Sequence, residues 1–332
     1  MIPVVCLAGP TGSGKTAAAL TLAKALNGEI INADSRQVYA DFPLVTAQPT
    51  PEERAGAPHH LYGFLSTDKK ISAGRWVEMA AAKADEVVRS GKIPILTGGT
   101  GLYFQALLRG ITNIPPIDPV ISARLAARLE KSDAPALHRE LAAADPDYAA
   151  RIHSNDRQRI LRALEVVEAT GRPFSWWHKN AMTPPRCKGP LFVINTDLNR
   201  LKPRLARRID QMLANGALEE AKKAFDRCND PAAPGWSGIG AAEILACLHG
   251  RIDLAGCRDL WLKNTRAYAK RQLTWFRAQP EALLIAPEKV LPALAVAASA
   301  TTAEARCQPR PTLQAKNTFL DEHHLDAFAV FS

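Results

Sequence analysis

The stretch Gly9-Pro10-Thr11-Gly12-Ser13-Gly14-Lys15-Thr16 decides the fold of this chain. It has the G-x-x-x-x-G-K-[ST] spacing of a phosphate-binding loop and lies between an apolar run, residues 4–8, and a helix-forming run, residues 17–26. This motif requires that order of strand, glycine-rich turn and helix. Glycines let backbone N–H groups converge on phosphate oxygens, and the helix N-terminus adds positive potential. The sequence therefore predicts a phosphate site in which Lys15 reaches the outer phosphate and the Thr16 hydroxyl binds Mg²⁺.

Strands and helices alternate through residues 1–114. Short apolar runs predict strands at 29–33 and 93–97, and a helix over 72–90 separates them. A second glycine-rich turn, residues 98–101, opens another helix. This alternation indicates an α/β fold, namely a P-loop NTPase-like parallel sheet flanked by helices.

The composition changes after this first part of the core. Residues 115–186 are rich in Ala, Leu and Arg with helical periodicity, which predicts an all-helical insertion domain. Residues 187–290 return to the core through a strand at 191–194 and end with a short strand at 283–285. The tail, residues 291–332, is expected to be weakly ordered.

Asp34 directly follows the predicted strand at 29–33. Because ligands of parallel sheets bind at the carboxyl ends of the strands, we expect Asp34, the phosphate loop and the turn at 98–101 to converge. A carboxylate there can bind Mg²⁺, bind a ribose, act as a general base or merely cap a turn. No acid closes the strand at 93–97, which disfavours a nucleotide-hydrolysing enzyme.

The charge balance indicates a polyanionic partner. The chain has 332 residues and a formal net charge of +9, and residues 257–277 alone hold six basic residues and one acidic residue. That segment interleaves cations with aromatic rings, as RNA-binding surfaces do, although a solvated helix face is equally compatible with the charge alone. Paired arginines at 159 and 162, and at 204 and 208, leave the same two alternatives open.

Cellular location is predicted from what the sequence lacks. No apolar run approaches the ~20 residues of a membrane span, so no membrane association is expected. The chain begins directly with strand and loop, which predicts that no signal peptide precedes it. Its six cysteines form no C-x-x-C pair, and this favours free thiols in a reducing cytoplasm over disulfides or a zinc site.

Taken together, these motifs resemble those of the tRNA dimethylallyltransferases of the bacterial type, over most of the chain. The phosphate loop alone is typical of ATP-binding proteins, but the order and spacing of all the segments are specific to that family. The resemblance rests on residues 9–16, 32–39, 58–61, 98–103, 155–159, 162–165 and 265–275.

The resemblance implies a function. Members of this family transfer a dimethylallyl group from dimethylallyl diphosphate to the exocyclic amine of adenosine-37 in the tRNA anticodon loop, giving isopentenyladenosine and diphosphate. The phosphate loop would then hold the diphosphate of the donor, with Mg²⁺ at Thr16 as the cofactor. Asp34 matches the general base, Thr100 lies beside it, and Arg208 matches the arginine that stabilises the departing diphosphate, with Arg204 as its nearest competitor. A monomer is expected.

The resemblance also implies the tRNA contacts, to which the basic helix adds three cations. The predicted tRNA-binding residues are Asp34, Ser35, Arg36, Gln37, Thr100, Ser122, Arg124, Gln158, Arg159, Ile160, Leu161, Arg162, Gly235, Trp236, Ser237, Gly238, Ile239, Gly240, Lys263, Arg266 and Lys270. The chain departs from the family at Gln48, where relatives often have lysine, and at Ser122, where they often have arginine.

Two other classes of protein share part of this pattern. A P-loop kinase that phosphorylates a small molecule or nucleotide with ATP has the same loop, but it leaves the basic segment at 257–277 unexplained. A non-catalytic RNA-binding protein gated by ATP explains the charge, but it gives Asp34 no role.

Overall fold

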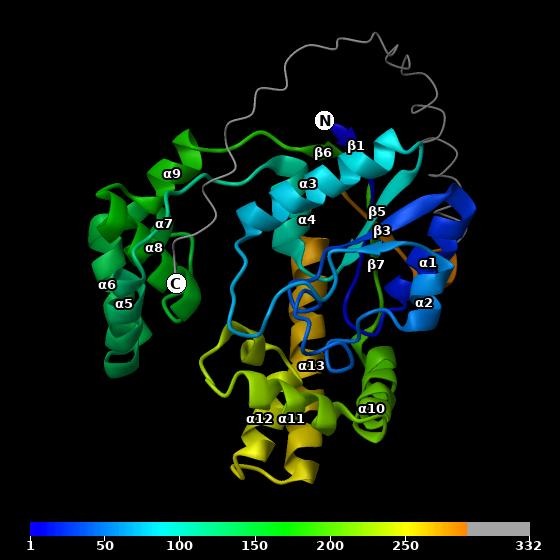
Figure 1. Ribbon diagram of the computed structural model, residues 1–332. Coiled ribbons are helices and arrows are strands. Elements are labelled where there is room, and N and C mark those ends of the chain that lie inside the picture. Colours follow the sequence, from blue (N-terminus) through cyan, green and yellow to red (C-terminus); the bar gives the residue numbers. More distant parts are fainter. Residues whose placement is uncertain (291–332) are drawn as a thin grey trace, which may run out of the picture.

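A computed structural model describes residues 1–290 of the chain (Figure 1). The tail at 291–332, predicted to be weakly ordered, lies outside the described residues.

The core is a six-stranded sheet in which every neighbouring pair of strands is parallel. The α/β fold class with a parallel sheet is therefore confirmed. In spatial order the strands are β4 (His59–His60), β3 (Gly28–Asn32), β5 (Ile93–Gly98), β2 (Val5–Ala8), β7 (Leu191–Ile194) and β8 (Ala282–Ile285). A separate two-stranded parallel ribbon pairs β1 (Ile2–Pro3) with β6 (Cys187–Lys188).

Helices cover both faces of this sheet, so its central strands are apolar throughout. Along β2, Val5 and Leu7 pack toward α1 (Lys15–Leu26), whereas Cys6 and Ala8 pack toward α3 (Ala73–Arg89) and α4 (Gly101–Arg109). The continuous apolar run at 4–8, read as a buried strand, reflects this double burial. α2 (Pro51–Gly56) packs beside α1 at the edge.

Local signals in the sequence set the boundaries of α3. The Ser72 hydroxyl accepts a hydrogen bond of 3.1 Å from the Arg75 N–H and so caps α3 at the start of the helix predicted over 72–90. Within α3, the buried Trp76 stacks on Tyr103 of α4 at 4.0 Å between ring centroids and donates its indole N–H to the Asn32 carbonyl. This contact fixes both helices against the end of β3.

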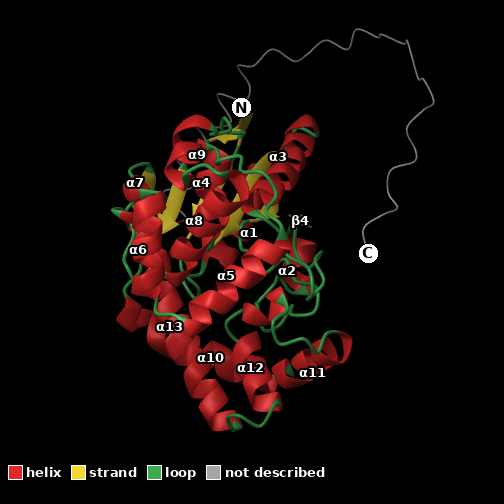
Figure 2. Ribbon diagram, turned by 90° about the vertical axis from the view of Figure 1, so that its left-hand side faces the viewer, coloured by secondary structure: helices red, strands yellow, loops and turns green. Residues whose placement is uncertain are grey.

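Five helices form a group of their own between α4 and β6, in the segment predicted to be a helical insertion. Figure 1 shows them apart from the sheet, and in Figure 2 they lie in front of it. They share one hydrophobic cluster, in which Leu125, Leu141 and Ile160 are fully buried. These helices are α5 (Pro119–Lys131), α6 (Ala134–Ala144), α7 (Pro146–Ala149), α8 (Arg157–Thr170) and α9 (Phe174–Asn180).

The last helices form a third layer below the carboxyl ends of the strands. α10 (Leu198–Ala214), α11 (Ala217–Arg227), a short 3-10 turn (Pro234–Ser237) and α12 (Ala241–Leu248) surround a cluster centred on Trp236 and Trp261. The 24-residue helix α13 (Leu254–Arg277) joins this layer to the sheet, because its Trp261 packs in the lower cluster and its Phe276 under the sheet. Figure 1 shows α13, in gold, running between the two.

Candidate active site

The phosphate loop lies between β2 and α1, as its motif predicts. Gly12 and Gly14 have φ values of +82° and +90°, in the left-handed region that favours glycine, and α1 begins at Lys15. The Ser13 hydroxyl is buried and has no hydrogen-bond partner among the described residues. A buried hydroxyl without a partner is costly, so it is suited to donate to a phosphate oxygen. This loop therefore fits a phosphate ligand in geometry and in its unused donors.

Lys15 folds back over its own loop, where its Nζ lies 3.5 Å from the Pro10 carbonyl oxygen. Burial lowers the pKa of its ammonium group to about 8, the charge of Asp34 opposes this shift, and the charge of Arg208 adds to it. Lys15, Asp34 and Arg208 thus share one electrostatic environment. A bound polyanion would relieve the repulsion between the two cations.

Arg208 reaches this environment from α10. It is partly buried, and burial lowers the pKa of its guanidinium group, an effect that the carboxylates of Glu53 and Asp34 oppose. Arg208 lines the pocket that contains Asp34 as well as an adjoining pocket between the N-terminus of α1 and α10. Arg204, one turn earlier, is exposed and lines only the adjoining pocket. The structure thus distinguishes the two arginines, and it favours Arg208 over Arg204 as the one that faces the phosphate loop and Asp34.

Asp34 follows the end of β3 and is held there by its neighbours. The Asn32 side chain, fully buried, accepts from the Asp34 N–H at 2.8 Å and donates to the Asp34 carbonyl at 3.0 Å and to the Leu61 carbonyl at 2.9 Å. The Arg36 N–H donates to Asp34 Oδ1 at 2.9 Å. The carboxylate is therefore oriented from one side, and it lines the pocket with Arg208 and Lys15.

Thr100 is joined to the segment after β3. Its hydroxyl accepts from the Ser35 N–H at 2.9 Å and donates to the Ser35 hydroxyl at 3.2 Å, and its own N–H donates to the Ala33 carbonyl at 3.2 Å. The turn at 98–101 and the segment at 33–35 are thus one connected structure. The structure brings together the phosphate loop, Asp34 and Thr100, as expected from the strand order.

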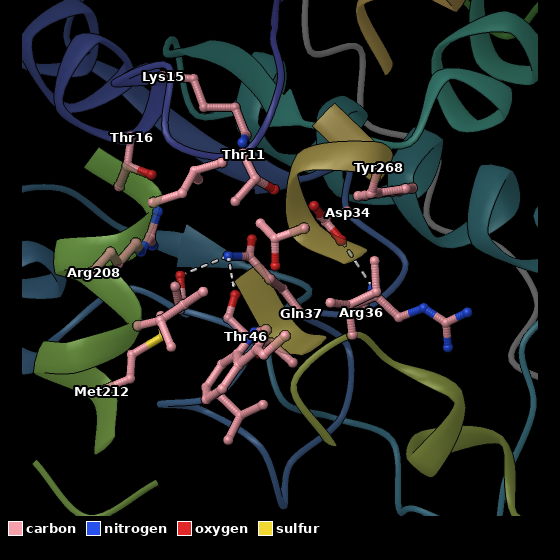
Figure 3. A pocket seen from close by; sticks show the side chains of 17 residues that line it. Thr11, Lys15, Thr16, Asp34, Arg36, Gln37, Thr46, Arg208, Met212 and Tyr268 are labelled. Carbon is pink, nitrogen blue, oxygen red and sulfur yellow. Dashed lines mark hydrogen bonds between the residues drawn. The ribbon is translucent and has the colours of Figure 1, made fainter. Parts of the chain in front are cut away.

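The pocket between these elements has a polar and an apolar side. In Figure 3, Asp34 and Arg208 face it from opposite sides, and Met212 lies below Arg208. The apolar side comes from four separate parts of the chain, and it was not predicted from the sequence. Its side chains are Val45, Leu205, Ile209, Met212, Ile239 and Trp261.

The segment at 34–37 also contacts the loop at 235–240, which was predicted to bind the same partner. Arg36 donates from Nη1 to the Ser237 hydroxyl at 2.8 Å, and in Figure 3 its side chain points away from the pocket centre. Gln37 points inward and donates from Nε2 to the carbonyls of Thr46 and Ala47 at 3.1 and 2.6 Å. Trp236 of that loop is buried in the lower cluster, so only its backbone is available to a partner.

The predicted residues of the insertion lie away from this pocket. Ser122 and Arg124 are on α5, which packs against α8, and Arg124 pairs with Glu168. Ile160 is fully buried in the insertion cluster, so its side chain cannot contact a partner. Of the other predicted residues on α8, Gln158, Arg159 and Arg162 are exposed and Leu161 is partly exposed.

The basic segment folds as one face of α13. Lys263, Arg266 and Lys270 are exposed, whereas Phe276 is buried and Trp275 half-buried. Cations therefore face solvent and aromatic rings face the protein.

Three polar residues on the inner face of α13 were not predicted as site residues from the sequence. Thr265 and Tyr268 line the pocket, and the buried Gln272 bonds the phosphate loop and the turn at 98–101. Burial raises the pKa of Tyr268 to about 12, so its hydroxyl keeps its proton. The spacing i, i+3, i+7 places all three on one helix face, and this was the available signal.

Gln48, the departure from the family lysine, is a buried structural residue here. Its side-chain amide donates to the Tyr39 carbonyl at 2.7 Å. His59 and His60 form the edge strand β4, where His60 pairs with Glu29 at 2.6 Å. We assign none of these three a chemical role.

Other classes of site are not found among residues 1–290. No group of three or more His, Cys, Asp or Glu side chains in this range could hold a metal ion, and its five cysteines are free thiols. Within the same range, no helix combines the length and the apolar character that crossing a bilayer requires.

Comparison with known proteins identifies the family. The family model described as IPP transferase matches residues 37–279. The tRNA dimethylallyltransferase of Desulfovibrio desulfuricans is 64% identical over 87% of this chain and 90% of its own length. That of Nitratidesulfovibrio vulgaris (strain Miyazaki F) is 54% identical over 86% and 90%.

Solved structures agree with these relatives. The tRNA isopentenylpyrophosphate transferase of Bacillus halodurans is 32% identical, with a TM-score of 0.65 over 92% of this chain and 99% of that one. A eukaryotic dimethylallyltransferase acting on tRNA is 28% identical, with a TM-score of 0.73 over 95% and 81%. On the evidence of its fold, its site and these relatives, the chain belongs to the IPP transferase family.

Proposed function

We propose that this chain transfers a dimethylallyl group from dimethylallyl diphosphate to the exocyclic amine of adenosine-37 in tRNA. One observation carries the proposal: a single pocket joins a phosphate loop, an inward arginine, an oriented carboxylate and an apolar wall. A kinase shares the phosphate loop, but an isoprenoid donor also accounts for the apolar wall beside it. The relatives named tRNA dimethylallyltransferase support the same assignment.

The donor fits the half of the pocket nearest the loop. Backbone N–H groups of the loop, the Ser13 hydroxyl, Lys15 and Arg208 would bind the diphosphate, and the apolar wall would hold the dimethylallyl chain. The Thr16 hydroxyl lines the same pocket and would hold Mg²⁺ beside the bound diphosphate. Mg²⁺ bound there would neutralise part of the charge of the leaving group.

The acceptor fits the half nearest Asp34. The adenine must leave its stack, which costs roughly a few kcal/mol. The lone pair of its exocyclic nitrogen forms a bond to C1 of the dimethylallyl group while the C1–O bond to diphosphate breaks. The nitrogen loses one proton, which the Asp34 carboxylate accepts. Lys15 and Arg208 stabilise the charge that develops on the departing oxygen.

The tRNA would lie across the basic surfaces around the pocket. The exposed cations of α13 and α8 suit backbone phosphates, and the segments at 34–37 and 235–240 suit the nucleotides near the target base. We further infer a monomeric enzyme, and we infer that it works in the cytoplasm, since the five cysteines of residues 1–290 are free thiols.

A transfer assay tests this proposal directly. The protein is incubated with Mg²⁺, unmodified tRNA and labelled dimethylallyl diphosphate, and a parallel sample receives labelled ATP with a panel of nucleosides and nucleotides. Label is expected in the RNA from the isoprenoid donor only. Phosphate transfer from ATP to a small molecule, with no label in the RNA, would make the chain a kinase.

Replacing Asp34 tests the general base. Asp34→Ala should lower the single-turnover rate by about 10²–10⁴-fold, because the attacking amine then has no placed proton acceptor. The matched variant Asp34→Asn keeps an oxygen for the Arg36 N–H and should be equally slow. tRNA affinity, measured by filter binding, should fall only slightly. A rate within about threefold of the parent would refute the role.

Arg208 and Arg204 provide a matched pair on one helix. Arg208→Ala should weaken the binding of inorganic diphosphate with Mg²⁺ by about tenfold or more, because a charged hydrogen bond in a partly buried site is lost. Arg204→Ala removes the same charge from the exposed position and should change the affinity by less than about threefold. Isothermal titration calorimetry measures both, and equal losses would argue against the assignment.

Removing charge from α13 tests the tRNA surface. Changing Lys263, Arg266 and Lys270 together to Gln should weaken tRNA binding and reduce the slope of log K against log salt concentration by about 2, because fewer counterions are released.

A matched control neutralises three exposed lysines elsewhere, Lys24 on α1 with Lys222 and Lys223 on α11. It gives the same net charge and should leave the slope near that of the parent. Equal changes in the two triple variants would show that only net charge matters.

A further inference from the structure

Gln272 links the phosphate loop to the turn at 98–101, and no other described side chain forms hydrogen bonds to both. It lies on the inner face of α13 and is buried, with 4% of its surface exposed. Its Oε1 accepts from the Thr11 N–H of the phosphate loop at 3.1 Å, and its Nε2 donates to the Gly99 carbonyl at 2.9 Å. One amide therefore holds the loop on one side and the turn beside Asp34 on the other.

The Gln272 amide packs closely against Gly99, near the Asp34 carboxylate. A methyl group at Gly99 would lie 2.1 Å from Gln272 Nε2 and 3.4 Å from Asp34 Oδ2. The absence of a side chain at Gly99 is therefore what lets the Gln272 amide approach the turn so closely beside the Asp34 carboxylate. A shift of Gln272 would move the turn, and with it the position of Thr100 relative to the phosphate loop.

We propose that Gln272 is a positioning residue, which fixes the separation between the donor's diphosphate on the loop and the acceptor amine beside Asp34. This inference rests on the proposed function. Gln272 has no need to touch either substrate, since its two hydrogen bonds already go to backbone groups. Its effect is on how the two bound substrates meet.

The physical reason is the steep dependence of transfer on geometry. The attacking nitrogen and C1 must approach to ~3–3.5 Å in line with the departing oxygen, and a misplacement of about 1 Å can cost about 10²-fold in rate. The donor would be held by the loop after β2, and the acceptor by Asp34 after β3, a segment to which Thr100 of the turn after β5 is hydrogen-bonded. Gln272 joins these segments on the same helix whose outer face carries Lys263, Arg266 and Lys270.

The test separates binding from transfer. Gln272→Met keeps the size of the side chain but removes both hydrogen bonds. Gln272→Glu keeps an acceptor for the Thr11 N–H but cannot donate to the Gly99 carbonyl. Each variant is measured for affinity toward inorganic diphosphate with Mg²⁺, for affinity toward tRNA, and for the single-turnover rate with both substrates saturating. The melting temperature is measured alongside.

Both variants are expected to transfer about ten- to a hundredfold more slowly. Gln272→Met should keep each affinity within about threefold of the parent, whereas the negative charge that Gln272→Glu adds beside the loop should also weaken diphosphate binding. The control is Gln279→Ala, which removes an amide near the end of α13 that bonds only the Trp275 carbonyl. This variant should transfer at the parental rate.

Three outcomes would overturn the inference. Parental rates in both variants would show that the link is not needed, and matching losses of rate and of both affinities would show that Gln272 only maintains the pocket. Absence of transfer by the parent protein would overturn the proposed function and this inference with it. A functioning parent with fast variants overturns the inference alone.

Discussion

The site depends on the close approach of β3 and β5 at their carboxyl ends. The Ala33 N–H donates to the Thr97 carbonyl at 2.8 Å, and a methyl group at Gly98 would lie 2.1 Å from the Ala33 carbonyl carbon. Only glycine permits this contact. The segments that follow β3 and β5 leave the sheet side by side, so Asp34 and Thr100 are neighbours although they are far apart in sequence. The phosphate loop follows β2, the next strand in the sheet.

α13 converts this strand-end arrangement into a closed pocket. Its lower half packs with α10 and α12, its upper half lies under the sheet, and its inner face supplies polar and apolar side chains to the space between. Its outer face supplies cations. A single helix therefore connects the cationic surface to the side chains that line the pocket.

The sequence predicted those features whose signal is local. Neighbouring residues alone determine such features, so they can be predicted. They are the phosphate loop, the start of the helix at Ser72, and the apolar strands at 93–97 and 191–194. β4 has only two residues and no pattern to detect. Asn32 and Gln272 look like ordinary polar residues until distant backbone groups become their partners. The apolar wall could not be predicted from the sequence for a similar reason, since Val45, Met212 and Trp261 become neighbours only after folding.

The bond between Thr11 and Gln272 spans 261 positions of the chain. A ribosome adds about 5–20 residues per second, so the phosphate loop emerges on the order of ten seconds or more before the amide that holds it. β2 likewise pairs with β7, and β7 with β8, so the six-stranded sheet is complete only after these later strands have been made. The phosphate-binding motif is thus synthesised well before the pocket, which is complete only when α13 has been made.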